Sequence, residues 1–576
     1  MKLSNTPAPT TAEPLEPVAF VVENRFGHGS GHLVRSARLA IAIEEAGGTA
    51  VVVVRPGRGR FTIADARALL GPSATAIQFV SELPAAYRLV VFDTRSVDDN
   101  DLQGLDPLRC VGLDVAGTGR RRLGLVLDML IAPARRSEPN LFDHRFLPGG
   151  SNQRDDWPQL PRRVLVIGGG QRGGYTFAAQ LIRRAPDCQV TLVGSYRQVG
   201  HDRMTIAARV PQLAERLWEY DLVVTHYGVL VHEALEANVP VLLRHRSRYH
   251  AVLGRRSGLI GARWWCRLGR KLAQWPEILE ASKRVRPPSG ESLQDILLRY
   301  RPPQVAVPAA ARVIQRDADR THYRERGTRM IYGVPLEPPA QTYGDEYFFQ
   351  EYRRQYGRTY LEDFDHIAAM GHRRVADIGR IAPLGNAKLL ELGCAFGPFL
   401  HAAAQAGASV CGVDLNPSAV QHVKTKLGLP AVVGNIDDLT QLAIDAQYDI
   451  VALWYVIEHV PDPERLLRQI AALLPPGGLL CFATPNANGI SGRRNMQRFL
   501  ERNPIDHYTA WSPASARRFL ARLGFRVLKT RTTGHHPERF PYAPKPETFA
   551  WRAVDAASRG FGLGDTFEVI ARKVGR

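Results

Sequence analysis

Cysteine is scarce in this 576-residue chain, which has only six. No two of them form a C-x-x-C pair or a Cys/His group with zinc-ligand spacing, which excludes a disulfide-stapled scaffold and a zinc finger. Single, scattered cysteines are typical of small apolar core residues in a reducing compartment, so we expect a cytoplasmic protein. The six are Cys110, Cys188, Cys266, Cys394, Cys411 and Cys481.

Long apolar runs are also missing. No window reaches about 18 consecutive apolar residues, so we expect no membrane-spanning helix. The polar N-terminus lacks the apolar core of a signal peptide, and residues 1–16 are expected to form a disordered tail. With 45% hydrophobic and 23% charged residues, the composition is ordinary for a globular protein and excludes a wholly disordered or collagen-like chain.

Acidic residues are few relative to basic ones, at 56 against 75, which gives a net charge of +19. Such an excess is typical of proteins that meet nucleic acid, an anionic membrane surface or acidic small substrates. Residues 244–330 hold 20 Lys+Arg and 7 Asp+Glu, a net of +13. Their arginines alternate with apolar residues at roughly helical spacing, and no nucleic-acid-binding motif is present. We therefore expect a solvated face of packed helices and no specific nucleic-acid binding. Attraction of anionic nucleotide-sugars, or contact of this face with a membrane surface, remains an alternative.

Short β-branched runs alternate with helical stretches along most of the chain, which predicts an α/β fold with buried parallel sheets. We expect three Rossmann-like units, at residues 17–150, 160–255 and 336–576, with a linker at 147–161 and a basic helical segment and linker at 256–335. The expected strands are residues 18–22, 50–54, 89–93, 110–114, 164–167, 189–193, 221–225, 240–243, 388–392, 409–413, 448–453, 478–484, 526–530 and 566–571.

The clearest motif in the third unit is LLELGCAFGPFL at residues 389–400, a strand that runs into a glycine-containing turn and then a helix. Glycines such as Gly393 and Gly397 let the backbone turn tightly and approach a ligand. The next expected strand ends in Asp414, 23 residues after Glu391, where an acid can accept both hydroxyls of a ribose. The missing G-x-G-x-x-G disfavours a dinucleotide, so the pattern predicts a nucleoside site.

These motifs resemble those of the class I S-adenosylmethionine-dependent methyltransferases, and the resemblance extends to the C-terminus. It implies a mixed seven-stranded sheet and S-adenosylmethionine as the cofactor. Two positions depart from the family pattern, since Ala395 replaces the middle glycine and Asn435 replaces an acid near the adenine. The residues implied to bind the cofactor are Glu391, Gly393, Cys394, Gly397, Asp414, Leu415, Asn435, Ile436 and Trp454.

Candidate catalytic residues follow the fourth strand of this unit and a later loop. Methyl transfer relies mainly on positioning, but an oxygen or nitrogen acceptor can also need a base. In the ubiquinone-type O-methyltransferases a similar Glu-His pair lies near the acceptor, which here is Glu458 and His459. His507 is a second candidate base and Tyr508 a candidate acceptor contact. The alternatives are a helix-start acid for Glu458, a packing residue for His459, and a cap on the helix after Ser512 for His507. No metal ligands are expected.

The first unit opens with FGHGSGHLVRSARL at residues 26–39, a glycine-rich turn before a helix. Such a turn lets a phosphate or sugar approach the helix N-terminus. Here Gly31 would lie against the substrate, His32 would act as acid or base, and Arg35 would clamp an anion. The pattern resembles the two-domain GT-B enzymes, most closely the nucleotide-sugar hydrolase of pseudaminic acid biosynthesis and its spore-coat relatives.

Residues 220–243 resemble the donor-binding signature of the same family, through Gly228, Glu233 and Pro240. Val229 and Leu230 replace the hydroxyl residues that would bind the diphosphate, so a degenerate fold retained for binding or scaffolding is the alternative. A second glycine pattern, G-x-G-x-x-G at residues 168–173, is not followed by an acid at the end of the next strand. This disfavours NAD and leaves only an NADP site that would depend on Arg197.

Taken together, the sequence predicts a methyltransferase fused to a domain that binds a nucleotide-sugar. Its acceptor would be a hydroxyl or amine of a sugar or related small molecule, in the synthesis of a surface polysaccharide or glycan. A second glycosyltransferase or hydrolase activity would reside in the N-terminal half. The alternatives are a methyltransferase with a non-catalytic glycan-binding module and an RNA methyltransferase. The oligomeric state is not indicated.

Overall fold

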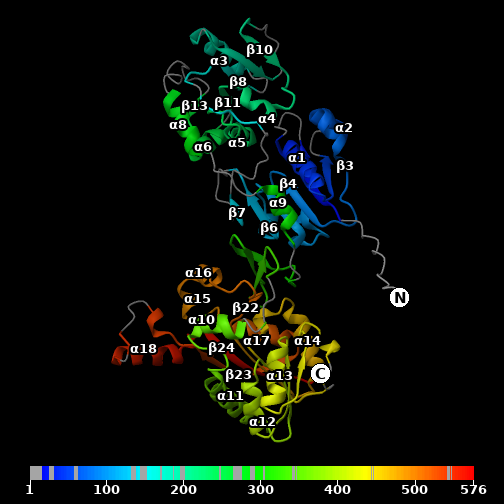
Figure 1. Ribbon diagram of the computed structural model, residues 1–576, viewed down its shortest axis with the longest axis vertical. Helices are drawn as coiled ribbons and strands as arrows, with labels where there is room; N and C mark the ends of the chain where they lie inside the picture. The colour runs from blue at the N-terminus through cyan, green and yellow to red at the C-terminus, as the bar shows by residue number, and fades with distance from the viewer. Residues whose placement is uncertain are drawn as a thin grey trace, which may run out of the picture. The chain divides into compact units, whose positions relative to one another are not determined.

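The computed structural model of the chain divides into two compact units, Met1–Tyr300 and Arg301–Arg576, which are described separately (Figure 1). The structure describes residues 16–24, 31–56, 62–130, 138–142, 152–157, 159–168, 172–185, 187–194, 201–245, 248–263, 275–285, 292–301, 305–339, 344, 347–442, 444, 447–540, 545–546 and 548–575. Residues 1–15 of the expected tail and residues 147–151 and 158 of the expected linker lie outside these residues.

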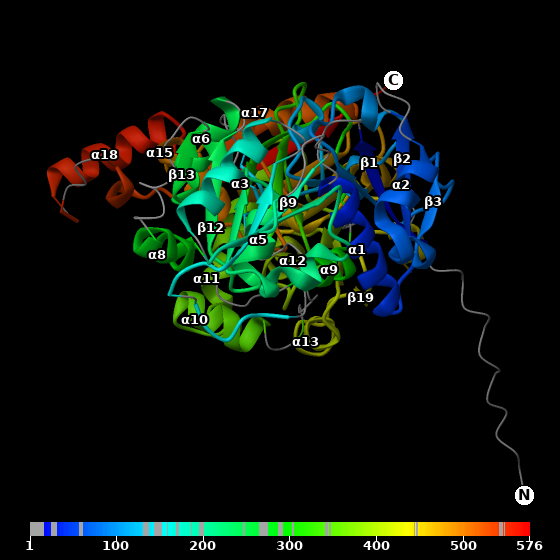
Figure 2. The same ribbon diagram turned by 90° about the horizontal axis from the view of Figure 1, so that it is seen from above.

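The first unit begins with a seven-stranded parallel sheet of order β3-β2-β1-β4-β5-β6-β7. Its central strands are fully buried, as their continuous apolar sequences predict. Helix α1 packs on β1 and β2 (Figure 2). The elements are β1 (Val18–Asn24), α1 (Gly31–Glu45), β2 (Ala50–Pro56), α2 (Ile63–Leu70), β3 (Gln78–Val80), β4 (Leu89–Asp93), β5 (Cys110–Leu113), β6 (Leu125–Asp128) and β7 (Leu141–Phe142).

A second parallel sheet in the same unit has the order β10-β9-β8-β11-β12-β13. Helix α8 joins the core of this sheet through Trp275 and Ile278, whereas α9 returns to α1. The elements are β8 (Arg163–Ile167), α3 (Arg172–Arg184), β9 (Gln189–Val193), β10 (Met204–Ala207), α4 (Leu213–Arg216), β11 (Leu222–Thr225), α5 (Val229–Glu236), β12 (Val241–His245), α6 (Arg248–Ser257), β13 (Gly261–Arg263), α8 (Trp275–Val285) and α9 (Leu293–Arg299).

The second unit contains the mixed seven-stranded sheet that the sequence predicts, in the order β19-β18-β17-β20-β21-β24-β23. Only β24 runs against its neighbours, between β21 and β23. Helix α11 packs on α12. The elements are α11 (Phe364–Gly379), β17 (Lys388–Leu392), α12 (Pro398–Gln405), β18 (Ser409–Asp414), α13 (Pro417–Lys426), β19 (Ala431–Val433), β20 (Ile450–Trp454), α14 (Pro463–Leu473), β21 (Leu479–Pro485), α17 (Pro513–Arg522), β23 (Phe525–Thr533) and β24 (Thr566–Lys573).

The expected helical segment and linker over residues 256–335 contains helices α8 and α9, but its last part, residues 312–335, is a small antiparallel sheet. Residues 312–335 form β14 (Arg312–Arg316), β15 (Arg320–Arg324) and β16 (Ile331–Pro335), and β16 pairs with β22 (Thr509–Ala510). Dense charge made this stretch resemble a solvated helix. However, Arg316 and Arg320 are buried, and Arg320 donates to the carbonyl of Pro504 at 2.8 Å. Arg320 therefore fastens the sheet to the loop before β22, whereas Arg316 donates to Thr321 within the sheet.

Further helices extend from the large sheet of the second unit. Helices α15 (Ile490–Arg494) and α16 (Met496–Glu501) follow β21, and α18 (Phe549–Gly560) lies between β23 and β24. Ahead of α11 come a π-helical turn at Tyr347–Glu351 and α10 (Tyr352–Tyr356). In the part of the chain that the structure describes, we find no helix with the length and apolarity needed to cross a membrane.

Candidate active site

The turn between β17 and α12 has the backbone conformation that its glycines suggested. Gly393 and Gly397 have φ values of 71° and 81°, and Ala395 between them has a φ of 46°. A Cβ atom on Gly393 would lie 2.4 Å from a methyl carbon of Val456, so only glycine fits there. Ala395 therefore takes the place of the usual middle glycine and adopts a left-handed conformation. A hydrogen bond from its N–H to Asp414 stabilises that conformation.

Asp414, at the end of β18, fixes this turn from the neighbouring strand. Its Oδ2 accepts the N–H of Ala395 at 2.7 Å, and its Oδ1 accepts the N–H of Asn416 at 2.9 Å. Burial raises the pKa of Asp414, and the backbone hydrogen bonds oppose this rise. A carboxylate has about four lone-pair sites, so both oxygens keep capacity for further donors.

Glu391 is buried in β17 beside the same turn. Its Oε2 has no hydrogen-bond partner among the described residues. Burial, reinforced by the charge of Asp414, raises the pKa of Glu391 well above its ordinary value, while Arg374 acts in the opposite direction. Burial also raises the pKa of the neighbouring Cys394 thiol, so this cysteine is not a nucleophile.

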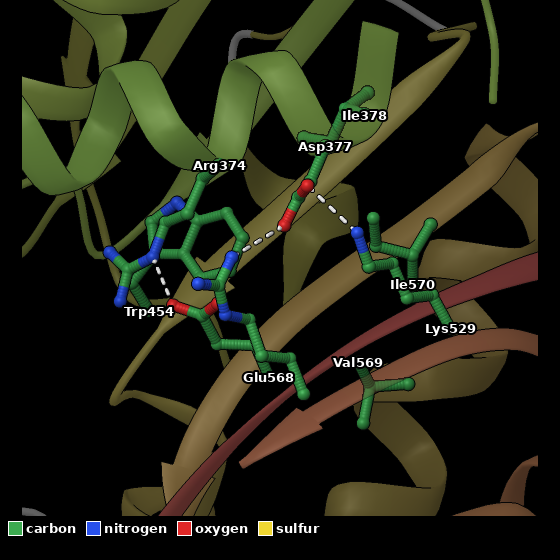
Figure 3. Close-up of a pocket in the computed structure, with 9 residues that line it drawn as sticks. Arg374, Asp377, Ile378, Trp454, Lys529, Glu568, Val569 and Ile570 are labelled. Carbon is green, nitrogen blue, oxygen red and sulfur yellow. Dashed lines mark hydrogen bonds and ion pairs between the residues drawn. The ribbon is translucent and has the colours of Figure 1, made fainter. Parts of the chain in front are cut away.

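Trp454 ends β20 and lines a pocket between α11 and the β23–β24 pair (Figure 3). The guanidinium of Arg374 lies over the Trp454 ring, 4.2 Å from its centroid, and donates to Glu568 at 2.9 Å. Asp377 pairs with Lys529 at 2.7 Å. Because its charged groups are matched in this way, the pocket braces α11 against the sheet. The Nε1 atom of Trp454 is buried without a partner in the described part of the chain.

The structure brings together three of the predicted catalytic side chains just beyond β20. One ligand atom each of Glu458, His459 and His507 lies within 4.8 Å of the others, so the group has the composition of a cation site as well as of an acid–base site. The His459 and His507 rings meet edge to face, with centroids 4.5 Å apart. Asp506, which the sequence analysis missed, places Oδ2 3.0 Å from Nδ1 of His459. The sequence feature that could have pointed to Asp506 is its position directly before His507 in the same loop.

The pKa values of Glu458, His459 and His507 are shifted in different directions. Burial raises the pKa of Glu458 to about 7. It lowers the pKa of His507 to about 3, and the charge of His459 adds to that effect. Burial would also lower the pKa of His459, but the hydrogen bond to Asp506 and the charge of Glu458 outweigh it and raise the value. His507 is therefore neutral at physiological pH, and His459 is the group suited to hold a proton.

Other predicted residues of this domain lie around the same edge of the sheet. Leu415 is exposed directly after Asp414. Asn435 accepts the N–H of Asp437 at 2.9 Å, which fixes the turn that contains the half-buried Ile436. Burial raises the pKa of Tyr508.

Two further observations concern residues near this edge. The predicted helix cap after Ser512 is provided by Ser512 itself and not by His507, because the Ser512 hydroxyl accepts the N–H of Ser515. Tyr455, which the sequence analysis missed, follows Trp454 with a φ of 60° and a surface that is 39% exposed. A non-glycine residue in this conformation is strained, a common feature of functional sites.

In the first unit, His32 and Arg35 lie at the carboxyl edge of the sheet, where His32 is half-buried and Arg35 is fully buried. His32 Nδ1 lies 2.5 Å from Oδ1 of Asp93, at the end of β4. Arg35 is buried, and its guanidinium bonds Asp93 at 2.9 Å and Asp114 at 2.7 Å. Although burial opposes ionisation, the charge of Arg35 holds the pKa of Asp93 far below its usual range. Both partners of Arg35 lie inside the fold, so its guanidinium is already engaged, which weighs against the predicted anion clamp.

The predicted donor-binding residues meet the first helix of this unit. Gly228 precedes α5, and a Cβ on Gly31 would lie 3.6 Å from Val229, which places the starts of α1 and α5 side by side. Glu233 is buried and bonds Arg38 of α1 at 2.6 Å, while burial raises its pKa. Residues 25–30, 169–171 and 195–200, which include Gly27, Gly29, Gly170 and Arg197, lie outside the described residues.

Comparison with known proteins concerns the C-terminal part of the chain. Residues 355–530 match a family model described as a methyltransferase domain. The ubiquinone biosynthesis O-methyltransferase of Coxiella burnetii is 32% identical over 158 residues, covering 26% of this chain and 68% of that protein. The same enzyme of Cupriavidus pinatubonensis is 26% identical over 185 residues, covering 30% and 74%.

Among solved structures, a SAM-dependent methyltransferase from Archaeoglobus fulgidus has 16% identity and a TM-score of 0.30, covering 39% of this chain and 100% of that chain. The sheet order and the turn after β17 are those expected of a methyltransferase, and the similarity to the Coxiella enzyme points to the same family. The C-terminal part of this chain thus belongs to the class I methyltransferases, and its cofactor is S-adenosylmethionine.

Proposed function

We propose that the C-terminal domain methylates a hydroxyl or amine of a sugar or related small acceptor, and that an oxygen is the favoured atom. One observation carries this proposal, the His459–Asp506 pair at the end of β20, 3.0 Å apart, on the edge where β17 and β18 also end. A hydroxyl must lose its proton as it is methylated, and a histidine oriented by a carboxylate can take it. The names of the related enzymes, ubiquinone biosynthesis O-methyltransferases, also support an oxygen acceptor.

The cofactor contacts we propose are those of the turn and its two acids. S-adenosylmethionine, when bound, supplies an electrophilic methyl group on a sulfonium. Asp414 would accept the ribose hydroxyls with the lone pairs that Ala395 and Asn416 leave available. Glu391, with a buried and unpartnered Oε2, would accept from the ammonium of the methionine part and become fully ionised on doing so.

On the acceptor side, His459 would hold the hydroxyl and take its proton on Nε2 as the methyl–oxygen bond forms and the methyl–sulfur bond breaks. Asp506, at Nδ1, would fix the ring orientation and stabilise the resulting imidazolium. A carboxylate oxygen of Glu458 lies within 4.8 Å of a ring nitrogen of His459 and adds a second source of negative charge as Glu458 ionises near pH 7. His507, neutral and packed edge to face on His459, would limit ring rotation.

For the N-terminal half we propose binding of a nucleotide-activated sugar, the substrate or a neighbour of the acceptor in surface-glycan synthesis. Two parallel sheets whose helices α1 and α5 begin side by side support this, because helix N-termini favour phosphates. The His32–Asp93 pair is the feature that would allow catalysis there. Against catalysis, Glu233 is already bonded to Arg38, and Val229 and Leu230 bring no hydroxyl, which favours a pure binding module.

The experiment that tests the methyltransferase proposal compares glycans from a strain that lacks the gene with glycans from its parent, by mass spectrometry. Loss of one methyl group per repeating unit, restored by the wild-type gene and not by His459→Ala, is expected. Identical glycan masses in the two strains would contradict the sugar acceptor. For the N-terminal half, purified His32→Ala protein is assayed for sugar-nucleotide turnover. Turnover equal to that of the wild type would refute a catalytic role for His32.

A further inference from the structure

An amphipathic helix leaves the methyltransferase sheet with its apolar side uncovered. Helix α18 projects to one side of the domain next to α15, in both views (Figures 1 and 2). Phe549, Ala553, Ala557 and Phe561 follow at intervals of four residues, so they share one face. All four are exposed, and the two phenylalanines are 87% and 77% exposed. A helix face with two fully solvated phenylalanines is an interaction surface and not part of a core.

The position of this helix relates it to the active-site edge of the sheet. The last residue of β23, Thr533, pairs with the first residue of β24, Thr566, which also pairs with Pro485 at the end of β21. Since β21 runs parallel to β20, the insertion leaves the sheet at the edge where Trp454 ends its strand. A surface that engages α18 would therefore lie on the acceptor side of the domain.

The part of the domain that contains this helix is basic. Residues 486–502 and 534–565, which contain α15, α16 and α18, hold eight Lys+Arg and five Asp+Glu, a net of +3. These two segments are joined, because Arg494 donates to the carbonyl of Arg539 at 3.0 Å and Ser491 donates to Asp565 at 2.7 Å. The exposed cations are Arg493, Arg494, Arg498, Arg502, Arg539, Lys545, Arg552 and Arg559.

We propose that this face, α18 with α15 and α16, docks on an anionic lipid bilayer surface. A helix with an apolar stripe and cationic flanks lies in the headgroup region, with its aromatic residues inserted and its cations near the lipid phosphates. A second copy of the chain fits less well, because the same face would meet its own positive charge. The stripe is also only four side chains, far fewer than the roughly 20–30 residues that each partner gives to a stable protein interface.

The test is co-sedimentation of the full chain with vesicles. Vesicles of phosphatidylglycerol and phosphatidylcholine in equal parts should bind the protein, vesicles of phosphatidylcholine alone should bind it weakly, and high salt should release it. The double variant Phe549→Ser/Phe561→Ser should lower partitioning by roughly tenfold or more. The matched control is Val574→Ser, an exposed apolar residue (52%) after β24, at the opposite edge of the same sheet, and its partitioning should not change.

A second variant pair tests the charge separately. Arg498→Glu/Arg552→Glu should reduce binding to the anionic vesicles and leave the weak binding to phosphatidylcholine unchanged. Affinity for S-adenosylhomocysteine, measured on every variant, reports that the domain is still folded. Three results would overturn the proposal: no binding to anionic vesicles, equal binding by the phenylalanine variant, or self-association of the wild-type chain through these phenylalanines without vesicle binding. Because donor binding is measured independently, failure here would leave the methyltransferase assignment intact.

Discussion

Replacement of Asp414 is the most direct perturbation of the proposed cofactor site. Its two oxygens each accept one backbone N–H, at 2.7 and 2.9 Å, from Ala395 and Asn416. If the remaining lone pairs accept the two ribose hydroxyls, Asp414→Ala removes both contacts at once. Asp414→Asn keeps the shape but turns one acceptor into a donor, which would face either a ribose hydroxyl or the N–H of Ala395.

The size of the effect follows from the number of bonds. A hydrogen bond to a charged group contributes about 1.5–3 kcal/mol, so loss of two costs about 3–6 kcal/mol. Since about 1.4 kcal/mol is tenfold in Kd, Asp414→Ala should weaken donor binding by roughly 10²–10⁴-fold. Asp414→Asn loses one acceptor and should weaken it by roughly ten- to a hundredfold. Burial raises the pKa of Asp414, so donor affinity of the wild type should also fall as the pH is lowered through that pKa.

The assay is isothermal titration of S-adenosylhomocysteine into the full chain. Asp449→Ala is the matched control, because Asp449 also accepts a backbone N–H, from Lys388 at 2.9 Å, but at the amino edge of the same sheet. This control separates loss of a structural hydrogen bond from loss of a ligand contact. Equal affinity for the wild type and Asp414→Ala would refute the reasoning, as would an equal loss in Asp449→Ala.

Three other perturbations test the electrostatics. Burial raises the pKa of Glu458 from 4.5 to about 7, so the folded state favours the neutral acid. As the pH rises from 4.5 to 7, the wild type should lose up to about 3 kcal/mol of unfolding free energy relative to Glu458→Gln, measured by urea unfolding. Asp506→Asn removes the carboxylate that raises the pKa of His459, so an NMR titration should place that pKa lower than in the wild type; an unchanged titration would contradict the pairing. Arg35→Met leaves Asp93 buried and unpaired and should destabilise the first unit by about 3–5 kcal/mol in urea unfolding, whereas a loss under 1 kcal/mol would show that the pair is not needed.

Strand positions and the cofactor turn could be predicted because each depends on neighbouring residues. The run at residues 388–392 coincides with β17, and the distance from Glu391 to Asp414 is set by one strand–turn–helix–strand unit. Fully apolar runs likewise marked the central strands of both N-terminal sheets. Local sequence contains this information, since turn chemistry and burial of both sheet faces act within a few residues.

The partners of the predicted side chains could not be predicted in the same way. His32 lies 61 positions from Asp93, and His459 lies 47 positions from Asp506, so the contact depends on which strands become neighbours. Arg35 has the composition of a phosphate clamp. Its bonds to Asp93, which ends β4, and to Asp114, which follows the adjacent strand β5, weigh against that role. The spacing of side chains along one element indicates a shared face but not what that face meets.

The pairing of β16 with β22 has a consequence for anyone who wishes to produce the catalytic domain alone. Tyr332 pairs with Thr509, and the N–H of Gly333 donates to the carbonyl of Tyr508 at 2.9 Å, next to the loop that holds Asp506 and His507. A gene fragment cut at residue 336, where the sequence alone suggested a boundary, would keep every cofactor motif and lose this support. We expect such a fragment to bind the donor while its acceptor loop is misplaced, so a faithful expression fragment begins at Arg301.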